Sequence, residues 1–493
     1  MESDPAAPAT DGSTTELGKA HLTLTDVIAQ SIGFIGPVFS AAFLLPSIAG
    51  LGFSGKGAGV YSPLALIVAT IGICGVAWII SCYARRIHAA GALYDYVTAA
   101  FGQRVGFLGG WIYYGGMTLL AVAIFPAFGG FMALTLLGNH DVDISWWILA
   151  LGAIVLVFGM TILGVQLATR AQLVLAVSSM AVIFGWVIYV IAKGGTGGNS
   201  ATPFDPTAIS FDNLFYGLLY ACLVFTGFET AANLAEETEN PRRSIPIAVI
   251  WSVIGVGAFY VVVMYALELA FGLDMAAFLN LENFPPLYSA AANPEFGGDT
   301  FGEIVQWIVL LDILAVALGV ANACSRGYFA LARDGRLPRP LGAVHPKFGT
   351  PWIAAALLGI VSIVVVVWTE LADGIVAGAD TDPGVWFRFF QFGATYGALG
   401  LILVYLLIAL SGFKGQAGEN RLWLGVAAVV GTAATLAAVW GTVNDAPPIY
   451  SLDKVWWLTA IWIGIGIVVM LILHSRGAFS RQTTAQARLT EPQ

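Results

Sequence analysis

Residues 225–248 read FTGFETAANLAEETENPRRSIPIA, and this stretch decides how the rest of the chain is interpreted. It begins with apolar residues typical of a membrane helix, is interrupted at Gly227, carries Glu229, and ends in Arg242 and Arg243. A charged side chain inside a membrane segment costs about 2.5–3.5 kcal/mol on insertion scales, so it normally faces a cavity or a partner. This combination predicts a substrate site inside a membrane transporter.

The composition of the chain predicts an all-α integral membrane protein. Of its 493 residues, 58% are hydrophobic and only 10% are charged, which leaves too little polar surface for a soluble protein. A spanning helix needs about 20 mostly apolar residues. We count twelve such runs, centred near Phe39, Ile71, Thr118, Val155, Ile183, Leu223, Val261, Val316, Val361, Gly400, Val430 and Ile465. The runs lack the ten-residue alternation of outer-membrane barrel strands.

The distribution of basic residues predicts the orientation. Lys and Arg in short loops are retained in the cytoplasm, and all but four of the 21 fall on one side, the exceptions being Lys56, Lys193, Arg388 and Lys454. We therefore expect a multi-pass protein of the cytoplasmic membrane with cytoplasmic polar tails at 1–24 and 476–493. The first tail lacks the features of a cleaved signal peptide. No basic patch interleaved with aromatic residues indicates nucleic acid as a partner.

Two spans are interrupted in a way that the others are not. Span one contains SIGFIGP at residues 31–37, and span six contains TGFE at residues 226–229. Gly and Pro disfavour a continuous helix, and paired interruptions in two halves indicate an inverted-repeat transporter with its substrate near the bilayer midplane. We expect a transporter domain at 25–475, with a first repeat at about 25–195, a second at about 210–412 and extra helices at about 420–475.

The chemistry of the site is expected to come from the interrupted backbone. Unwound residues expose amides at a half-helix N-terminus and carbonyls at a half-helix C-terminus, which suits a zwitterion. The alternative is that the glycines only permit close helix packing. The candidate substrate-binding residues are Gln30, Ser31, Gly33, Phe34, Ile35, Gly36, Pro37, Val38, Leu223, Phe225, Thr226 and Gly227.

Candidate gating or coupling residues accompany this site. Glu229 either caps amides of the broken helix, carries a proton or contacts the substrate, and Asp312 either takes part in coupling or in a polar network. Phe225 is expected to close over the substrate from the outside, whereas Tyr114 lines the cavity or packs in an ordinary way. Glu268 is expected to be solvated at the outer end of span seven.

Enzymatic chemistry is not expected. The five histidines are scattered at tails and loop edges, and the sequence contains no nucleophile motif, metal cluster or cofactor motif. The four cysteines lie in or beside apolar runs without CxxC spacing, so we expect buried small residues. The chain is therefore predicted to need no metal or cofactor.

Three segments resemble the amino acid-polyamine-organocation superfamily of permeases over most of the chain. They are residues 227–246 around span six, residues 322–351 (beginning NACSRGYFALARDGRLPRPLGAVHPK) after span eight, and residues 91–111, which contain GALYDYV and GFLGGW, before and at span three. The resemblance implies a five-plus-five inverted repeat with discontinuous helices one and six and two C-terminal helices. It also implies a secondary active transporter that moves amino acids by alternating access around a central site.

The resemblance further places the unwound part of span one on residues 35–37, the gating aromatic near residues 223–225, and the span-six acid on Glu229. Arg243 and Arg326 then resemble cytoplasmic gate elements in exposed ion pairs worth about 0.2–1 kcal/mol each. A proton or sodium ion is a possible coupling partner, beside the small-molecule substrate and the lipid bilayer.

Two departures keep other functions open. Pro37 stands where many members supply an amide to the substrate carboxylate, which leaves room for a polyamine, another organic amine or a γ-amino acid, transported or exchanged. Some members hold a lysine in span five in place of sodium, and no lysine lies between Arg170 and Lys193. A channel or a transporter-like nutrient receptor with the same fold is the remaining alternative.

Overall fold

The computed structural model of the chain describes residues 17, 21–50, 56–371, 384–416, 418–443, 454–480 and 483–484. The predicted cytoplasmic tails at 1–24 and 476–493 lie largely outside these residues.

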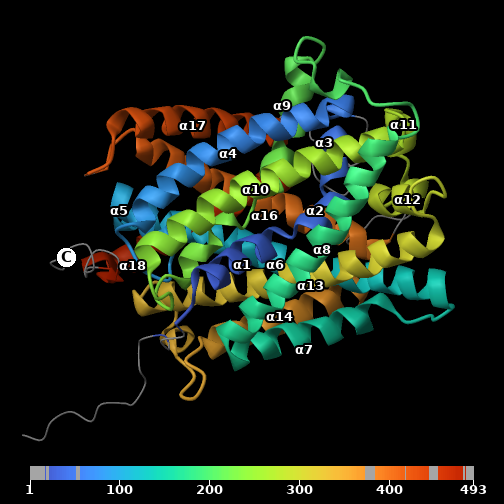
Figure 1. Cartoon of the computed structure of the whole chain (residues 1–493). Helices are drawn as coiled ribbons and strands as arrows, with labels where there is room; N and C mark the ends of the chain where they lie inside the picture. The colour runs from blue at the N-terminus through green and yellow to red at the C-terminus, as the bar shows by residue number, and fades with distance from the viewer. Residues whose placement is uncertain are drawn as a thin grey trace, which may run out of the picture.

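Twelve helical segments in the described part of the chain are long and apolar enough to cross a membrane, which confirms the predicted number. They lie side by side in one bundle (Figure 1). Ten are single helices: α4 (Ser62–Ala84), α6 (Gln103–His140), α7 (Trp146–Leu163), α8 (Val165–Lys193), α10 (Pro241–Ala270), α13 (Asp299–Arg333), α14 (Trp352–Leu371), α16 (Val385–Gly412), α17 (Arg421–Val443) and α18 (Val455–Ser475).

Spans one and six are the two discontinuous segments. Span one consists of α1 (Leu24–Ile35) and α2 (Pro37–Phe43), and span six consists of α9 (Phe211–Leu223) and the 3₁₀ helix η4 (Phe228–Leu234). The predicted interruptions in spans one and six are therefore confirmed. The boundaries of the inverted repeats stay a prediction.

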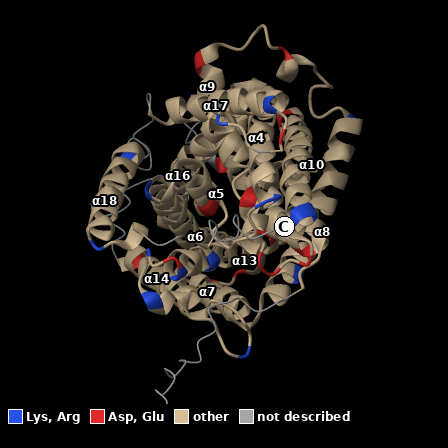
Figure 2. Cartoon of the chain, turned by 90° about the vertical axis from the view of Figure 1, so that its left-hand side faces the viewer, with Lys and Arg blue, Asp and Glu red and all other residues tan. Residues whose placement is uncertain are grey.

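Short helices lie between the spans. They are α3 (Leu45–Ala49), α5 (Leu93–Phe101), α11 (Met275–Phe278) and α12 (Pro286–Ala292). The helix α5 lies at the end of the bundle that carries most of the basic residues. We call this end the basic face, defined by residues 85–92, 236–243, 333–351 and 413–421, and Figure 2 views it end on.

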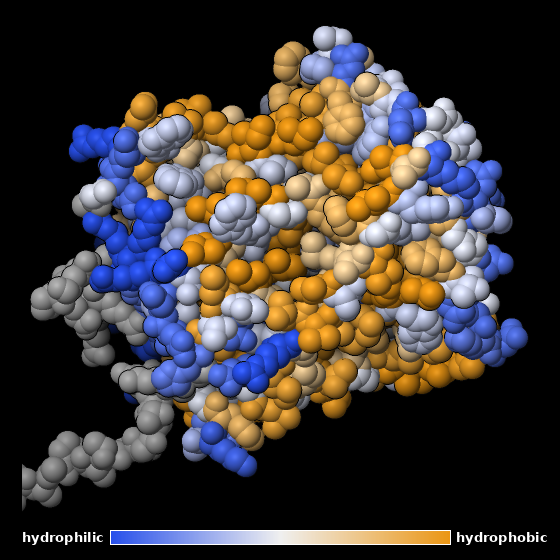
Figure 3. All heavy atoms as spheres, viewed as in Figure 1, coloured by the Kyte–Doolittle hydropathy of each residue, from blue (hydrophilic) through white to orange (hydrophobic). Residues whose placement is uncertain are grey.

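The outer surface has the hydropathy pattern of a membrane protein. Apolar residues form the middle of the view in Figure 3, and hydrophilic residues gather at its left and right ends. The outermost helix is α18, of which only 17% of the spanning window is buried. Exposed apolar side chains on it, such as Ile461 and Val468, therefore face the bilayer.

The discontinuous spans lie at the centre of the bundle. The helix α1 contacts α8, α10, α13 and η4, and α2 contacts α8, α10 and α13 (Figure 1). The spanning windows of both interrupted segments are 83% buried, the highest share among the twelve. This central burial places backbone breaks where bulk water does not reach them.

Three of the four cysteines are buried as predicted, and Cys74 is not. All four are free, with Cys82, Cys222 and Cys324 buried and Cys74 half-buried.

Candidate substrate site

The break in span one is a single left-handed residue followed by proline. Gly36 has φ 58° and ψ 71°, a conformation that glycine adopts without the steric cost of a Cβ. Pro37 then occupies the first turn of α2, where its missing N–H costs nothing. The next two amides, of Val38 and Phe39, both donate to Asp312 Oδ2 at 2.8 Å. The half-helix N-terminus is therefore occupied by a protein carboxylate.

The break in span six is a turn that ends in a second left-handed glycine. The helix α9 ends at Leu223, and Gly227 has φ 112° before η4 begins. Ser31 Oγ donates to the carbonyl oxygen of Phe228 at 2.8 Å. A Cβ on Gly227 would lie 2.1 Å from Phe34 Cδ1. The two breaks therefore touch each other, with glycine required by both the backbone angle and the close approach.

Glu229 is fully buried and held by two tyrosines. Tyr113 Oη of α6 donates to Oε1 at 2.7 Å, and Tyr405 Oη of α16 donates to Oε2 at 2.7 Å. The amide of Gly227 donates to Oε2 at 3.2 Å. Hydrogen bonds to a charged acceptor are about twice as strong as neutral ones. The geometry therefore favours the structural reading of Glu229, as a side chain that fixes the span-six break to two neighbouring spans.

The candidate residues in span one mostly hold helices together. Gln30 Nε2 donates to the carbonyl of Gly319 at 2.9 Å, and Asn322 Nδ2 donates to Gln30 Oε1 at 3.5 Å. Gln30 therefore joins α1 to α13, as Ser31 joins α1 to η4. All twelve predicted substrate-binding residues are buried at the two breaks. Their role in binding stays a prediction.

A neutral side chain occupies the junction of spans one, five and eight. Gln172 of α8 donates from Nε2 to the carbonyl of Ala315 at 3.0 Å. A Cβ on Gly33 would lie 2.9 Å from Gln172 Cβ. An uncharged amide therefore makes the contact between these spans.

Aromatic rings pack on the side of the breaks that lies away from the basic face. Phe43 lies 5.3 Å from Phe131, 5.4 Å from Phe284 and 5.9 Å from Phe390, measured between ring centroids. We call the cluster of seven rings the aromatic layer; its members are Phe39, Phe43, Phe131, Phe284, Trp386, Phe387 and Phe390. Phe225 instead packs edge to face on Tyr260, at 5.8 Å, so the ring predicted to cover the site is not part of this layer.

Two ion pairs close the opposite side, at the basic face. Arg326 donates from Nε and Nη2 to the Glu237 carboxylate at 2.6 and 3.0 Å, and both side chains are at most 2% exposed. Arg333 binds Glu236 in the same bidentate way at 2.6 and 2.9 Å. We call these the paired gate. The prediction of an exposed pair at Arg326 was wrong, because α13 and η4 pack over both side chains.

Two other predicted positions differ from expectation, and a third packs in the ordinary way. Arg243 is exposed in the first turn of α10 and forms no ion pair with the described residues. Tyr114 is the one that packs in the ordinary way: it donates to the Gly91 carbonyl at 2.9 Å and accepts from Asn233. Glu268 is fully buried, and neither carboxylate oxygen has a hydrogen-bond partner among the described residues, so the predicted solvation was wrong.

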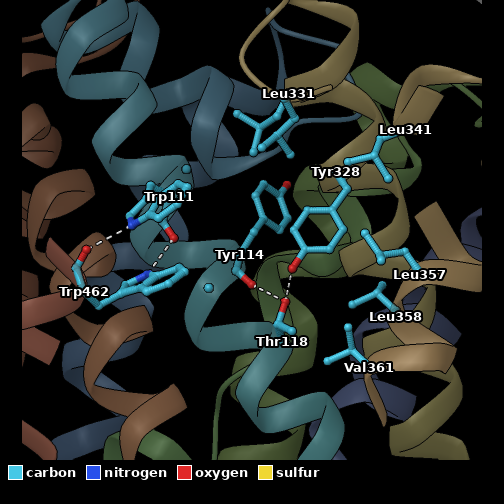
Figure 4. Close-up of a pocket in the computed structure, with 13 residues that line it drawn as sticks. Trp111, Tyr114, Thr118, Tyr328, Leu331, Leu341, Leu357, Leu358, Val361 and Trp462 are labelled. Atoms are coloured by element: carbon cyan, nitrogen blue, oxygen red, sulfur yellow. Dashed lines mark hydrogen bonds between the residues drawn. The ribbon is translucent and has the colours of Figure 1, made fainter. Parts of the chain in front are cut away.

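A cavity of about 180 Å³ lies between α6, α13, α14 and α18, and its lining contains no residue of the two breaks. Figure 4 shows its wall. The Thr118 hydroxyl donates to the backbone carbonyl of Tyr114 and is also hydrogen-bonded to the Tyr328 hydroxyl. Trp111 and Trp462 each donate from the indole nitrogen to the other's backbone carbonyl. Its other walls are apolar leucine and valine side chains. A cavity with so few free polar atoms does not suit a charged or zwitterionic substrate.

Comparison with known proteins decides the family. The family model described as amino acid permease matches residues 27–473. The chain belongs to this family. A low-affinity putrescine importer of Escherichia coli, PlaP, is 29% identical over 313 residues, which cover 62% of this chain and 66% of that protein. The aligned part is thus just under two thirds of that relative's length.

Other relatives of the permease carry different names. The branched-chain amino acid permease BcaP of Bacillus subtilis is 24% identical over 362 residues, covering 70% of this chain and 73% of that protein. A manganese transporter of Eremococcus coleocola shares the fold, with a TM-score of 0.52 and 14% identity over 96% of this chain and 99% of its own. These relatives are named for different solutes, so the substrate of this permease has to be inferred from its own residues.

The first prediction concerns Glu229. Glu229→Gln keeps one oxygen acceptor and the side-chain size, so the free energy of unfolding should fall by only about 1 kcal/mol. We expect transport to fall further, by about tenfold or more, measured as uptake into liposomes beside thermal melts. Tyr405→Phe removes one donor only and serves as the control. Equal uptake by Glu229→Gln and wild type across a pH series would remove Glu229 from the mechanism.

The second prediction concerns the paired gate. Arg326→Ala leaves Glu237 buried and uncompensated, so the free energy of unfolding should fall by about 3–5 kcal/mol. Arg326→Met combined with Glu237→Leu removes both charges and should recover most of that loss. Denaturation in detergent of the wild type, Arg326→Met, Glu237→Leu and the variant with both changes gives the double-mutant cycle. Additive effects of the two changes would contradict a direct pair.

The third prediction concerns Asp95 in α5, beside the paired gate. Burial and the nearby Asp334 carboxylate raise the pKa of Asp95 well above its usual range, although Arg333 acts in the opposite direction. The folded protein thus keeps a proton that the unfolded chain releases, so stability falls as the pH rises above about 4 toward the raised pKa. Asp95→Asn should flatten this fall and give the higher Tm at neutral pH. Parallel Tm-against-pH curves would refute the assignment.

Proposed function

We propose that this permease is a secondary active transporter that moves an amino acid or a related organic amine across the cytoplasmic membrane by alternating access. The basic face is then cytoplasmic, as the distribution of Lys and Arg predicts. The observation that carries the proposal is the contact between the two helix breaks, through Ser31 and Phe228 and through Gly227 and Phe34. Contacting half-helices near the middle of the bundle are the usual site geometry of inverted-repeat transporters.

The two sides of the breaks support alternating access because they are closed by different chemistry. The aromatic layer seals the outer side by apolar packing, and the paired gate seals the inner side by charge. Each closure joins different parts of the bundle. The aromatic layer joins α2 with α6 and α16, and the paired gate joins the segment after η4 with α13. A substrate that enters past one layer is released only after the other separates.

The named relatives do not identify the substrate of this permease, because they carry the names of different solutes. One is named for putrescine, one for branched-chain amino acids and one for methylthioribose. The family therefore supports a small organic solute, and this chain's own site residues have to narrow the class. The coupling ion stays open between a proton and sodium, with Gln172 providing no titratable group at the junction of spans one, five and eight.

A channel and a nutrient receptor are the alternatives with the same fold. Counterflow separates them: liposomes that contain the purified protein are preloaded with unlabelled solute and given a trace of labelled solute outside. A carrier should accumulate label transiently above equilibrium, because loaded sites exchange across the membrane. A channel gives monotonic equilibration, and a receptor gives no movement; either result would overturn the proposal. Protein-free liposomes are the control.

A further inference from the structure

The backbone amides that would receive a substrate carboxylate are already occupied. Pro37 has no N–H, so Val38 and Phe39 provide the first free donors of α2. Both donate to the same oxygen of Asp312, at 2.8 Å each. The carboxylate comes from the middle of α13, 273 and 274 residues further along the chain. A substrate carboxylate would have to displace it or lie beside it.

Displacement of Asp312 is unfavourable for a physical reason. Val316 lies one helical turn further along α13 and packs so closely on the break that a Cβ on Gly36 would be 2.0 Å from its Cγ2. Asp312 is 0% exposed, so a displaced carboxylate would lose two hydrogen bonds without reaching water. Two carboxylates at one site would also repel each other.

The second oxygen of Asp312 has no partner. Oδ1 makes no hydrogen bond and Asp312 forms no ion pair with any residue that the structure describes. Burying a carboxylate with one oxygen unsatisfied costs free energy, and an ammonium group relieves that cost through a charge-assisted hydrogen bond. Oδ1 is therefore an acceptor at the helix break that lacks a cation.

The surroundings of Asp312 fit an amine better than a bare metal ion. Tyr260 of α10 lies within electrostatic range of Asp312, and its hydroxyl already donates to the carbonyl of Val224 at 3.0 Å. The ring of Phe225 packs on Tyr260. Aromatic faces attract organic cations, whereas a metal ion needs several free oxygens. One free oxygen with Tyr260 nearby matches an alkylammonium group.

We infer that the permease recognises its substrate by an ammonium group held at Asp312 Oδ1, and that its substrates are organic amines without an α-carboxylate. This inference rests on the proposed transport function and narrows it. Asp312 then has two roles at two oxygens: Oδ2 holds the N-terminus of α2, and Oδ1 binds the amine. An α-amino acid would bring a carboxylate to a site whose amide donors are taken.

Matched pairs of ligands test the inference directly. Cadaverine and lysine, putrescine and ornithine, and tyramine and tyrosine each differ only by the α-carboxylate. Binding to the full-length purified protein is measured by thermal shift, since a ligand that binds only the folded state raises Tm. We expect the amine of at least one pair to bind about tenfold or more tightly than its amino acid. Tighter binding of the amino acid in the pairs, or no binding by any amine, would overturn the inference.

Counterflow with the same pairs separates this inference from the transport proposal. Preferred binding of an amine without counterflow would overturn transport and leave the recognition of amines standing. Counterflow of amino acids in preference to amines would overturn the recognition and leave transport standing. The wild-type protein alone therefore gives a decisive answer for both.

A variant locates the recognition at Asp312. Asp312→Asn keeps an oxygen to accept from the two amides but removes the charge, so amine binding should weaken by about tenfold or more. The matched control is Glu268→Gln, which neutralises another fully buried acid whose oxygens lack partners, and should leave the amine preference unchanged. Thermal melts without ligand check the folding of both variants. Wild-type amine affinity in folded Asp312→Asn would exclude the assignment.

Discussion

A helix that breaks inside a bilayer leaves backbone N–H and C=O groups that bulk water cannot reach, and each needs a partner within the protein. In this permease the amides of Val38 and Phe39 donate to Asp312, and the amide of Gly227 donates to Glu229. The carbonyl of Phe228 accepts from the Ser31 hydroxyl. The polar side chains at the centre are therefore placed by the needs of the broken backbone. A substrate at this centre can bind only polar atoms that are not already hydrogen-bonded to the backbone, and the Oδ1 atom of Asp312 is one of them.

The two closures around this centre differ in how water affects them. Separating the aromatic layer exposes apolar surface, which costs about 25 cal/mol for each Å². Separating the paired gate exposes charges that regain hydration, and this hydration offsets much of the lost Coulomb attraction. In the proposed transport cycle, the side at the basic face would then open at modest cost, provided that both partners of each pair become hydrated together. Replacing only one partner of a pair destabilises the protein instead, because the remaining charge stays buried without a counter-charge.

Much of the architecture could be predicted from the sequence because spanning helices require long apolar runs. Gly36, Pro37 and Gly227 are in addition strong local signals for helix breaks. The acids at 229 and 312 were also visible, since charge is rare in such segments. The hydrogen-bond partners of these acids could not be predicted. Tyr113 and Tyr405 meet Glu229 from spans three and ten, and nothing in sequence spacing places them together. The aromatic layer left a partial signal in the Trp386–Phe390 run, and Glu236 and Glu237 lay in the quoted motif, but their burial against α13 depends on packing.

Two backbone hydrogen bonds near the start of span one link it to the segment that follows span six. The amide of Leu22 donates to the carbonyl of Glu237 at 2.9 Å, and the amide of Glu239 donates to the carbonyl of Leu22 at 3.1 Å. This short parallel bridge joins the start of α1 to the segment that follows η4. In the proposed transport cycle, we therefore expect the two half-helices to move as one unit, and only after Glu236 and Glu237 separate from the two arginines of α13.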